Sequence, residues 1–333
     1  MKIQVTKGIL EQLAALPGTT DIGKLLRHQA GLTKREIRQA KFRPGGILKN
    51  GVRCRVTEPV KQGDMILVCL ESEENRSDHL ETFQGEEPRA LAVLYEDEDL
   101  LVAEKPAGMA SHPSGGHYRD TLANLVQSHL LGKGEACRIR PVGRLDRETS
   151  GIMVFAKNQA AAARLGEQRK KGEFQKIYTA LARGELPAGS SGCICRPIGP
   201  DPGNRLRMRI DEKGKAAVTH WRAEASGGGY SLLKLWLETG RTHQIRVHMA
   251  WMGYPLAGDR LYGEHTENGM CRAALHAGRV RLIQPFTGKA LEFEATLPWD
   301  MRELAENTLR GVLRLCGKVP ETSGTIIFPE NPS

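Results

Sequence analysis

The sequence contains no apolar run close to the roughly 20 residues that a membrane-spanning helix needs. Its first residues, Met1 to Thr6, also lack the apolar core of a secretory signal. These two absences predict a cytoplasmic protein with no membrane among its partners.

Cysteine and glycine are present without the spacing that would give them a special role. The seven cysteines are odd in number and only Cys193 and Cys195 lie close together, which excludes a disulfide framework and a zinc motif. The glycine run at 227–229 precedes an expected strand rather than a helix, so it does not form a phosphate-binding loop. His243 and His248 are five residues apart, a spacing that does not align two metal ligands on one helix face. We therefore expect no nucleotide cofactor and no metal.

The charge is distributed unevenly along the 333 residues, which carry a net charge of +9. The balance is +8 over residues 1–70, −9 over 71–100 and +10 over the rest. A basic small part, an acidic connector and a basic large part are typical of a protein that binds a polyanion. Basicity alone does not separate RNA from DNA or from an anionic membrane.

The first 70 residues predict a small α/β domain. Asp21 can cap a helix over 22–27, and Thr33 with Glu36 forms a capping box for a second helix. Asn50 and Gly51 predict a hairpin turn, and an apolar strand ends near residue 68. This order of elements over residues 15–70 resembles an S4-type RNA-binding module. The resemblance implies phosphate contacts from the basic helix and the adjoining strand, at Lys34, Arg35, Arg38 and Lys49. The alternative is a small domain with a solvated basic helix face.

The remaining chain predicts an acidic linker over residues 71–90, a catalytic domain over 91–317 and a tail over 318–333. In the catalytic domain, short strand patterns alternate with a few helix patterns, which indicates an α+β fold with a mixed, mostly antiparallel sheet. The expected strands are 100–104, 152–156, 177–182, 217–223 and 232–237. The expected helices are 121–131, 159–170, 242–252 and 301–315, the second capped by Asn158 and the last by Asp300.

Asp146 is the most informative residue of the catalytic domain. It lies in the run Gly143–Gly151, between two arginines and just ahead of an apolar strand. A carboxylate can act as nucleophile or general base without a cofactor, and a nearby guanidinium keeps it ionised. The alternative from this segment alone is a turn-capping aspartate, because Asp-x-x-Thr-Ser-Gly is good turn chemistry.

Two further segments supply the groups that such a carboxylate needs. Tyr178 lies in a strand pattern, where an aromatic ring can stack on a flipped base or simply be half-buried. The block Thr239–His248 carries several cations, and helical spacing places Arg246 beside an apolar stripe that starts at Ile245.

These segments together resemble the RluA-type pseudouridine synthases, which isomerise uridine in structured RNA. Further matches extend the resemblance over about residues 90–300, in the family's order and spacing. They are Leu101–Met109, Pro255–Gly263, Leu275–Ala277 and Gln284–Gly288.

The resemblance assigns roles residue by residue. It implies that Asp146 is the catalytic residue, that Tyr178 lies in the uracil pocket and that Arg246 pairs with Asp146. Arg144 would hold the opened RNA, with a plain phosphate contact or a surface ion pair to Glu148 as the alternatives. Arg241 and His243 would touch the RNA backbone or form a solvated helix start. Lys105 and Pro106 would shape the sheet. Many members of the family carry histidine where this chain has Gly143, so any role of that side chain is absent.

The expected activity is therefore RNA pseudouridine synthesis, with no cofactor and no obligate protein partner. Members with an S4 module commonly act on large-subunit (23S) ribosomal RNA, which makes that RNA the expected substrate. The alternatives are a transfer RNA pseudouridine synthase and a non-catalytic RNA-binding factor in ribosome assembly.

Overall fold

A computed structural model describes residues 2–18, 20–43, 45–69, 80–85, 90–135, 137–263 and 270–315. The chain forms two compact units, residues 1–175 with 280–293 and residues 176–279 with 294–333. We call them unit 1 and unit 2 and describe each by itself. The division passes through the predicted catalytic domain, and the domain boundaries predicted from the sequence stay predictions. Most of the predicted linker and the whole predicted tail lie outside the described residues. None of the helices described is long and apolar enough to cross a membrane.

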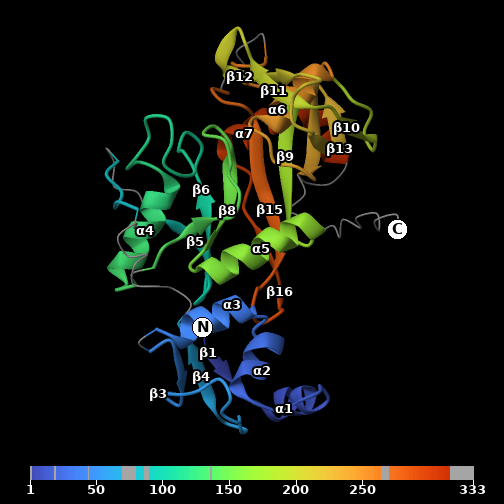
Figure 1. Ribbon diagram of the computed structural model, residues 1–333. Coiled ribbons are helices and arrows are strands. Elements are labelled where there is room, and N and C mark those ends of the chain that lie inside the picture. The colour runs from blue at the N-terminus through green and yellow to red at the C-terminus, as the bar shows by residue number, and fades with distance from the viewer. Residues whose placement is uncertain are drawn as a thin grey trace. The chain divides into compact units, whose positions relative to one another are not determined.

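Unit 1 begins with an N-terminal module in which helices cover a small antiparallel sheet of order β1-β4-β2-β3 (Figure 1). Its core is formed by apolar side chains from all three helices and the sheet, including Leu13, Leu25, Ile37 and Ile66. The elements are β1 (Lys2–Gln4), α1 (Lys7–Ala14), α2 (Ile22–His28), α3 (Lys34–Lys41), β2 (Ile47–Lys49), β3 (Val52–Arg53) and β4 (Met65–Val68).

Local capping explains where these helices begin. The Asp21 carboxylate accepts a hydrogen bond from the Lys24 amide at 2.8 Å, as its position before the helix predicted. Thr33 and Glu36 form the expected capping box. Between β2 and β3 the turn residues Asn50 and Gly51 have φ values of 52° and 81°, the left-handed pair that a tight hairpin requires.

The remainder of unit 1 is built on two buried strands that pair antiparallel, β6 (Leu100–Lys105) and β8 (Ser150–Ala156). Both strands are apolar along almost their whole length because they are buried on both faces of the sheet. β5 (Ala92–Glu96) pairs with β6, and β7 (Arg140–Pro141) pairs with β8. The helices are α4 (Leu122–Gly132) and α5 (Gln159–Lys171), the latter capped by Asn158 as predicted. Part of β15 (Leu275–Ile283) and almost all of β16 (Ala290–Glu294) also belong to this unit.

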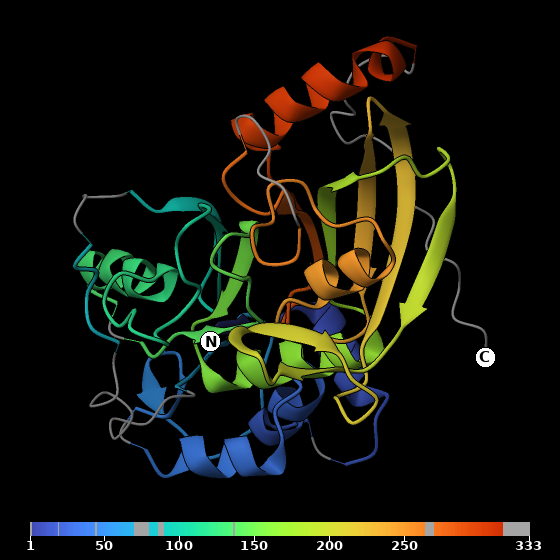
Figure 2. The same cartoon turned by 90° about the horizontal axis from the view of Figure 1, so that it is seen from above.

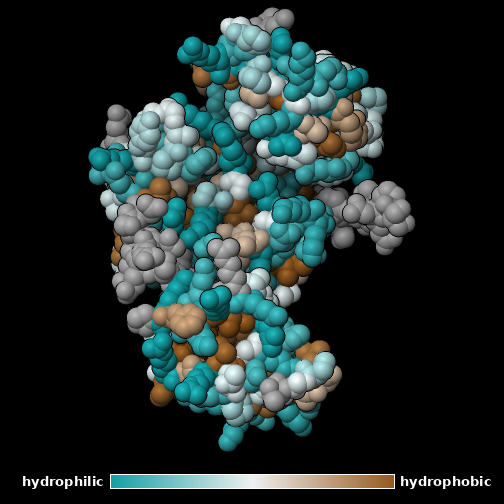
Figure 3. Space-filling model, viewed as in Figure 1, coloured by the Kyte–Doolittle hydropathy of each residue, from teal (hydrophilic) through white to brown (hydrophobic). Residues whose placement is uncertain are grey.

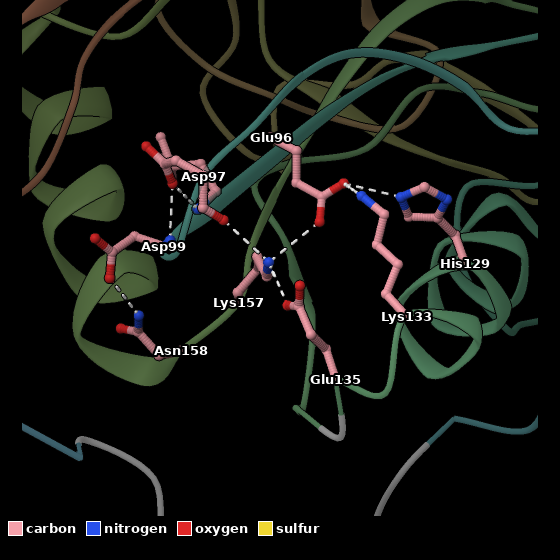
Figure 4. A network of polar contacts seen from close by, with 9 residues as sticks. Glu96, Asp97, Asp99, His129, Lys133, Glu135, Lys157 and Asn158 are labelled. Atoms are coloured by element: carbon pink, nitrogen blue, oxygen red, sulfur yellow. Dashed lines mark hydrogen bonds and ion pairs between the residues drawn. The ribbon is translucent and has the colours of Figure 1, made fainter. Parts of the chain in front are cut away.

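A polar cluster joins the turn after β5 to the end of β8 (Figure 4). Lys157 contacts the Glu96 carboxylate at 3.2 Å and donates to the Asp97 carbonyl at 3.0 Å. Glu96 also contacts His129 and Lys133 of the α4 region at 2.8 and 2.7 Å. Burial alone would raise the pKa of Glu96, but the hydrogen bonds from Lys133, His129 and Lys157 outweigh it and lower the pKa to about 2. This cluster ties the end of β5 to the α4 region and to the residue that follows β8.

Residues 81–84, part of the predicted linker, make several hydrogen bonds within unit 1. The Glu81 carbonyl accepts from the Asn124 side chain, and the Phe83 amide donates to the Ser128 hydroxyl, both at 2.8 Å. This part of the acidic segment therefore lies against α4.

Unit 2 is an antiparallel sheet of long strands with two helices packed against it. Helix α7 packs on β13 and β14, whereas α6 packs on β12 and β13; Figure 2 shows α7 in red and α6 in orange on separate parts of these strands. The elements are β9 (Gln175–Arg183), β10 (Ser191–Cys195), β11 (Ile198–Asp201), β12 (Asn204–Ile210), β13 (Val218–Gly227), β14 (Tyr230–Leu237), α6 (Gln244–Trp251) and α7 (Trp299–Leu315).

The start of α7 differs from the prediction. The helix begins at Trp299, so Asp300 lies in its first turn rather than at the capping position. Its carboxylate receives two hydrogen bonds from Arg272, at 2.7 and 2.9 Å. The prediction was wrong because a charged partner distant in sequence binds the carboxylate that local spacing assigned to a cap.

Candidate active site

Asp146 lies in the loop between β7 and β8 of unit 1. It is partly exposed, and the neighbouring Arg144 and Arg147 are exposed. The Thr149 amide donates to the Asp146 carbonyl at 3.1 Å, which closes a turn. The loop thus places a partly exposed carboxylate between two exposed cations.

A buried lysine holds this loop from below. Lys105, at the end of β6, has no solvent-exposed surface, and its ammonium donates to the carbonyls of Pro106, Met109 and Arg147 at 2.9, 2.7 and 3.1 Å. An ammonium has three protons, and these three carbonyls match them. Arg147 is the residue after Asp146, so Lys105 ties the Asp146 loop to the turn that follows β6.

Ser111 makes a second tie between the same two loops. Its hydroxyl donates to the Leu145 carbonyl at 2.6 Å and accepts from the Leu145 amide at 3.0 Å. Beside it, burial lowers the pKa of His112, and the charge of Arg144 lowers it further. At neutral pH His112 is therefore an uncharged imidazole next to an exposed guanidinium.

Arg169 of α5 is a cation at this loop that the sequence analysis did not single out. Gly143 has φ 84°, and a Cβ built on it would lie 3.4 Å from the Arg169 guanidinium. The space beside Gly143 therefore faces an exposed arginine. Only its place in the run of basic residues that ends α5 could have indicated it.

In unit 2, Gln244 fixes the start of the helix that carries Arg246. The buried Gln244 amide donates to the Val218 carbonyl at 2.9 Å and to the Thr219 hydroxyl at 3.0 Å. Its oxygen accepts from the Thr239 hydroxyl at 2.9 Å and from the Arg241 amide at 3.0 Å. Gln244 thus binds both ends of the turn before α6 and attaches this turn to β13.

Arg246 forms a buried ion pair with Asp259. Its Nε and Nη2 donate to the two carboxylate oxygens of Asp259, each at 2.7 Å. The residues are 4% and 0% exposed. The pairing with Asp146 expected from the resemblance stays a prediction, because the two residues lie in different units. Asp259 appeared in the sequence analysis only inside the segment Pro255–Gly263, without a role.

His243 and Arg241 have anchored positions at the start of α6. His243 has φ 56°, a left-handed conformation, and its Nδ1 lies 2.9 Å from the Tyr262 hydroxyl. Arg241 donates through Nε to the Ala216 carbonyl at 2.9 Å. Both side chains are only partly exposed, so this helix start is more ordered than a solvated one.

Tyr178 lies on β9 opposite Leu235 of β14 and is 8% exposed. The structure therefore brings Tyr178, Arg241, His243 and Arg246 into unit 2 and places Arg144 and Asp146 in unit 1. In each unit, the elements that carry the predicted site residues are held by contacts within that same unit.

The structure places the predicted RNA contacts of the N-terminal module in different surroundings. Lys34 and Arg38 are exposed on α3, while the side chain of Arg35 lies outside the described residues. Lys49 instead pairs with Asp64 at 2.8 Å and donates to the Pro59 carbonyl at 2.8 Å. Burial would raise the pKa of Asp64, but the hydrogen bonds from Lys49, the Lys61 amide and Asn50 lower it to about 2.

Among the residues that the structure covers, no group of three or more histidine, cysteine or acidic side chains is placed to hold a metal ion. Burial lowers the pKa of His248, which contacts the Thr219 hydroxyl at 2.8 Å and the Arg196 carbonyl at 3.0 Å. His248 thus has a packing role in holding α6.

Comparison with known proteins places these arrangements in a family. Residues 99–251 match the family model described as RNA pseudouridylate synthase. A Bacillus subtilis protein named as the RNA pseudouridine synthase YhcT is 43% identical over 247 residues, which are 74% of this chain and 79% of that protein. The chain belongs to the RNA pseudouridine synthase family. It is therefore an isomerase, and the expected activity is confirmed.

Two other similarities support the family and the fold. Ribosomal large subunit pseudouridine synthase D of Escherichia coli O157:H7 is 36% identical over 274 residues, covering 78% of this chain and 82% of that protein. The structure of human RNA pseudouridylate synthase domain containing 1 is 29% identical, covers 67% of this chain and 91% of its own, and has a TM-score of 0.54. The predicted α+β class with a mostly antiparallel sheet is confirmed.

Proposed function

We propose that this pseudouridine synthase acts on uridine in a structured, non-helical site of large-subunit ribosomal RNA, in the cytoplasm. The support is the relative named for the ribosomal large subunit and the basic N-terminal module. RNA sequence is best recognised where bases are already unstacked, such as loops and bulges.

The catalytic group in this proposal is Asp146. The observation that carries it is the loop itself: a carboxylate between two exposed arginines, held from beneath by Lys105 and Ser111. A side chain that served only as a turn cap would not need two buried ties to a neighbouring loop. Such ties keep a reactive group in place, and a misplacement of about 1 Å can cost about 100-fold in rate.

The reaction has a simple atomic balance. Asp146 starts cleavage of the C1′–N1 glycosidic bond of a uridine flipped out of the RNA. The detached uracil rotates in the pocket and its C5 joins C1′; the C5 proton is then released and N1 takes up a proton, so the product is an isomer of the substrate. In this proposal Tyr178 offers an aromatic face to the uracil, and Arg246 is the cation expected to pair with Asp146. The chemistry needs neither a metal nor a cofactor.

The exposed side of α3 provides a binding surface for RNA. Lys34, Arg38 and Lys41 are exposed, and Phe42 at the end of the helix is 70% exposed. An exposed ring beside cations can stack on an unpaired base while the cations contact phosphates. The face of the protein shown in Figure 3 is mostly hydrophilic, with apolar residues in patches. In unit 1, Arg144 and Arg169 add cations close to Asp146.

The direct test is release of tritium from RNA labelled at C5 of uridine. Wild-type protein should release tritium from ribosomal RNA that lacks the modification, and Asp146→Asn should release none while folding normally. Glu167→Gln is the matched control, because Glu167 is an exposed carboxylate of unit 1 paired with Lys170. It should leave the rate unchanged.

The substrate is decided by mapping pseudouridine in ribosomal and transfer RNA from a deletion strain. Sites lost on deletion and restored by wild type, but not by Asp146→Asn, identify the target. Loss confined to transfer RNA would make the protein a transfer RNA enzyme. Binding of ribosomal RNA with no tritium release from any RNA would favour a non-catalytic assembly factor.

A further inference from the structure

Cys193 and Cys195 place two thiols side by side on the surface of unit 2. They lie two positions apart on β10, so their side chains point to the same face of the sheet. Both side chains are exposed, and their Sγ atoms are 3.2 Å apart. In the part of the chain that the structure describes, β10 is an edge strand paired with β13. The two sulfurs are therefore accessible to small molecules in solution.

The polar groups that face the pair come from β13 and from the residue after β14. His220 lies opposite Cys193 in the register of β10 and β13, and its Nε2 is 2.7 Å from a carboxylate oxygen of Glu238. Partial burial raises the pKa of the Cys193 thiol, and the contact with Cys195 and the negative charge of Glu238 raise it further, to about 12. Cys193 therefore keeps its proton at neutral pH, and Cys195 is the sulfur left to attack.

Two adjacent thiols can bind a soft metal ion or exchange with a disulfide. Among the described residues, no third histidine, cysteine or acidic side chain completes a metal-ligand group with them. Exchange needs only the two thiols, one that attacks and one that displaces the bound group. Residues two apart on a strand have Cα atoms about 6.4–6.8 Å apart, near the upper limit that a disulfide spans. A bond here is strained and easily reduced, which suits a reversible site rather than a permanent cross-link.

The residue that follows the pair contacts α6. The Arg196 carbonyl lies 3.0 Å from Nε2 of His248, and Cζ of Arg196 lies 5.1 Å from the centre of the Trp251 ring. His248 and Trp251 both belong to α6. Because Arg196 is joined directly to Cys195, a change in the backbone at Cys195 acts on the residue that holds this helix.

We propose that Cys193 and Cys195 are a reversible oxidation site whose oxidant is a low-molecular-weight disulfide such as oxidised glutathione. The Cys195 thiolate attacks one sulfur of the oxidant, which forms a mixed disulfide and releases one glutathione thiolate. Cys193 then loses its proton and attacks the Cys195 sulfur, which releases the second glutathione thiolate. The protein gives up two electrons and two protons, and the oxidant becomes two thiols. The new bond distorts the end of β10 and loosens the contact of Arg196 with α6.

The test equilibrates the full-length protein with mixtures of reduced and oxidised glutathione, stops exchange with acid and measures the masses of tryptic peptides. The peptide that carries both thiols, residues 184–205, contains no other cysteine. In excess oxidised glutathione it should lose the mass of two hydrogens without gaining glutathione, and reduced glutathione should restore it. Cys271→Ser is the matched control, because Cys271 is an exposed cysteine of the same unit. It should leave this result unchanged.

Single variants test which thiol attacks. Cys193→Ser should trap a mixed disulfide between Cys195 and glutathione. Cys195→Ser should form its mixed disulfide at least about 10-fold more slowly, because burial and Glu238 still disfavour the Cys193 thiolate.

Hydrogen exchange tests the link to the helix. The amides of α6 should exchange at least about 5-fold faster in oxidised than in reduced wild type. A double variant with serine at both Cys193 and Cys195 should give the same exchange under both conditions.

Each result decides one step of the proposal. A peptide that stays reduced in excess oxidised glutathione overturns it, as does glutathione on both thiols or a disulfide between two protein molecules. Equal rates for the two single variants would overturn the attack by Cys195. Unchanged exchange of the α6 amides in oxidised protein would overturn the link to this helix. None of these measurements uses RNA or catalysis, so their results do not depend on the proposed function.

Discussion

Replacing Lys105 with methionine should impair catalysis far more than folding. Lys105→Met keeps an unbranched side chain, one atom shorter, and removes the ammonium that joins the turn after β6 to the loop of Asp146. The variant therefore separates the placement of the loop from the stability of the unit.

The change in stability can be worked out from the three contacts. Only the bond to the Met109 carbonyl is fully buried, and leaving that acceptor unsatisfied costs about 1–3 kcal/mol. The Pro106 and Arg147 carbonyls are part-buried, so water can replace the ammonium there. Against these losses, methionine avoids the burial of a charge, which costs several kcal/mol. The opposing terms leave a net loss of about 2 kcal/mol or less.

The expected effect on activity is larger. Without Lys105 the loop loses one of its ties, while the Ser111 tie and the contact of Arg147 with Gly108 remain, so Asp146 should be held less firmly in position. We expect kcat to fall about 100-fold, measured by tritium release, with an unfolding midpoint in urea close to that of wild type.

Lys157→Met is the matched control, because Lys157 is a second buried lysine of unit 1 tied to Glu96 and Glu135 rather than to the loop. It should lower stability and leave kcat within about 2-fold. The reasoning is refuted if Lys105→Met retains wild-type kcat, or if it unfolds the protein while Lys157→Met does not.

Three further predictions concern stability. Burial lowers the pKa of His276 to about 4, so this side chain makes the free energy of unfolding fall as pH drops below the ordinary pKa near 6.5. In His276→Gln, the loss of unfolding free energy between pH 7 and pH 4, measured by urea titration, should be smaller by about 3 kcal/mol. The pKa of Glu96 is lowered to about 2, so its ionised form stabilises the fold above about pH 4.5 and this stabilisation is lost as pH falls below that value. Glu96→Gln should therefore make the free energy of unfolding depend less on pH between pH 5 and 2.5. An unchanged slope would contradict this. Gly143→Ala should lower the free energy of unfolding by about 1–2 kcal/mol, because Gly143 has a φ of 84°. Gly166→Ala in α5, where a Cβ meets nothing within 4 Å, should raise it by about 0.5–1 kcal/mol. Thermal denaturation of both variants makes the comparison.

Local chemistry made much of the fold predictable. Asp21, Thr33 and Asn158 cap the helices that their positions indicated, because a cap is decided by residues within three positions. The strands of the catalytic region are found close to their expected ranges, since their apolar runs are long and bounded by turns. The chain's division into two units was not predicted, because it depends on which strands pair across long separations.

Partners of charged residues were the weakest part of the prediction. Lys49 pairs at 2.8 Å with Asp64, fifteen residues away and just ahead of β4, a partner that spacing did not indicate; its contact with RNA stays a prediction. Asp300 was expected at a helix cap, yet Arg272 takes its carboxylate. Spacing along an element predicts a direction for a side chain, but an ion pair depends on which element lies opposite.

The same limit explains why the sequence indicated the chemistry of some residues but not the contacts of others. Asp146 and Arg246 were recognised because their motifs point to chemistry. Lys105 and Asp259, which hold them, are fully buried groups of opposite charge to the residue they serve. Each supporting residue lies in a different motif from the residue it supports, 41 positions before Asp146 and 13 after Arg246. Lys105 and Ser111 support the same loop, so the losses of activity on removing each should not be additive. Lys105→Met combined with Ser111→Ala should lower kcat by clearly less than the product of the two single losses, because once one tie has released the loop the other has little left to hold.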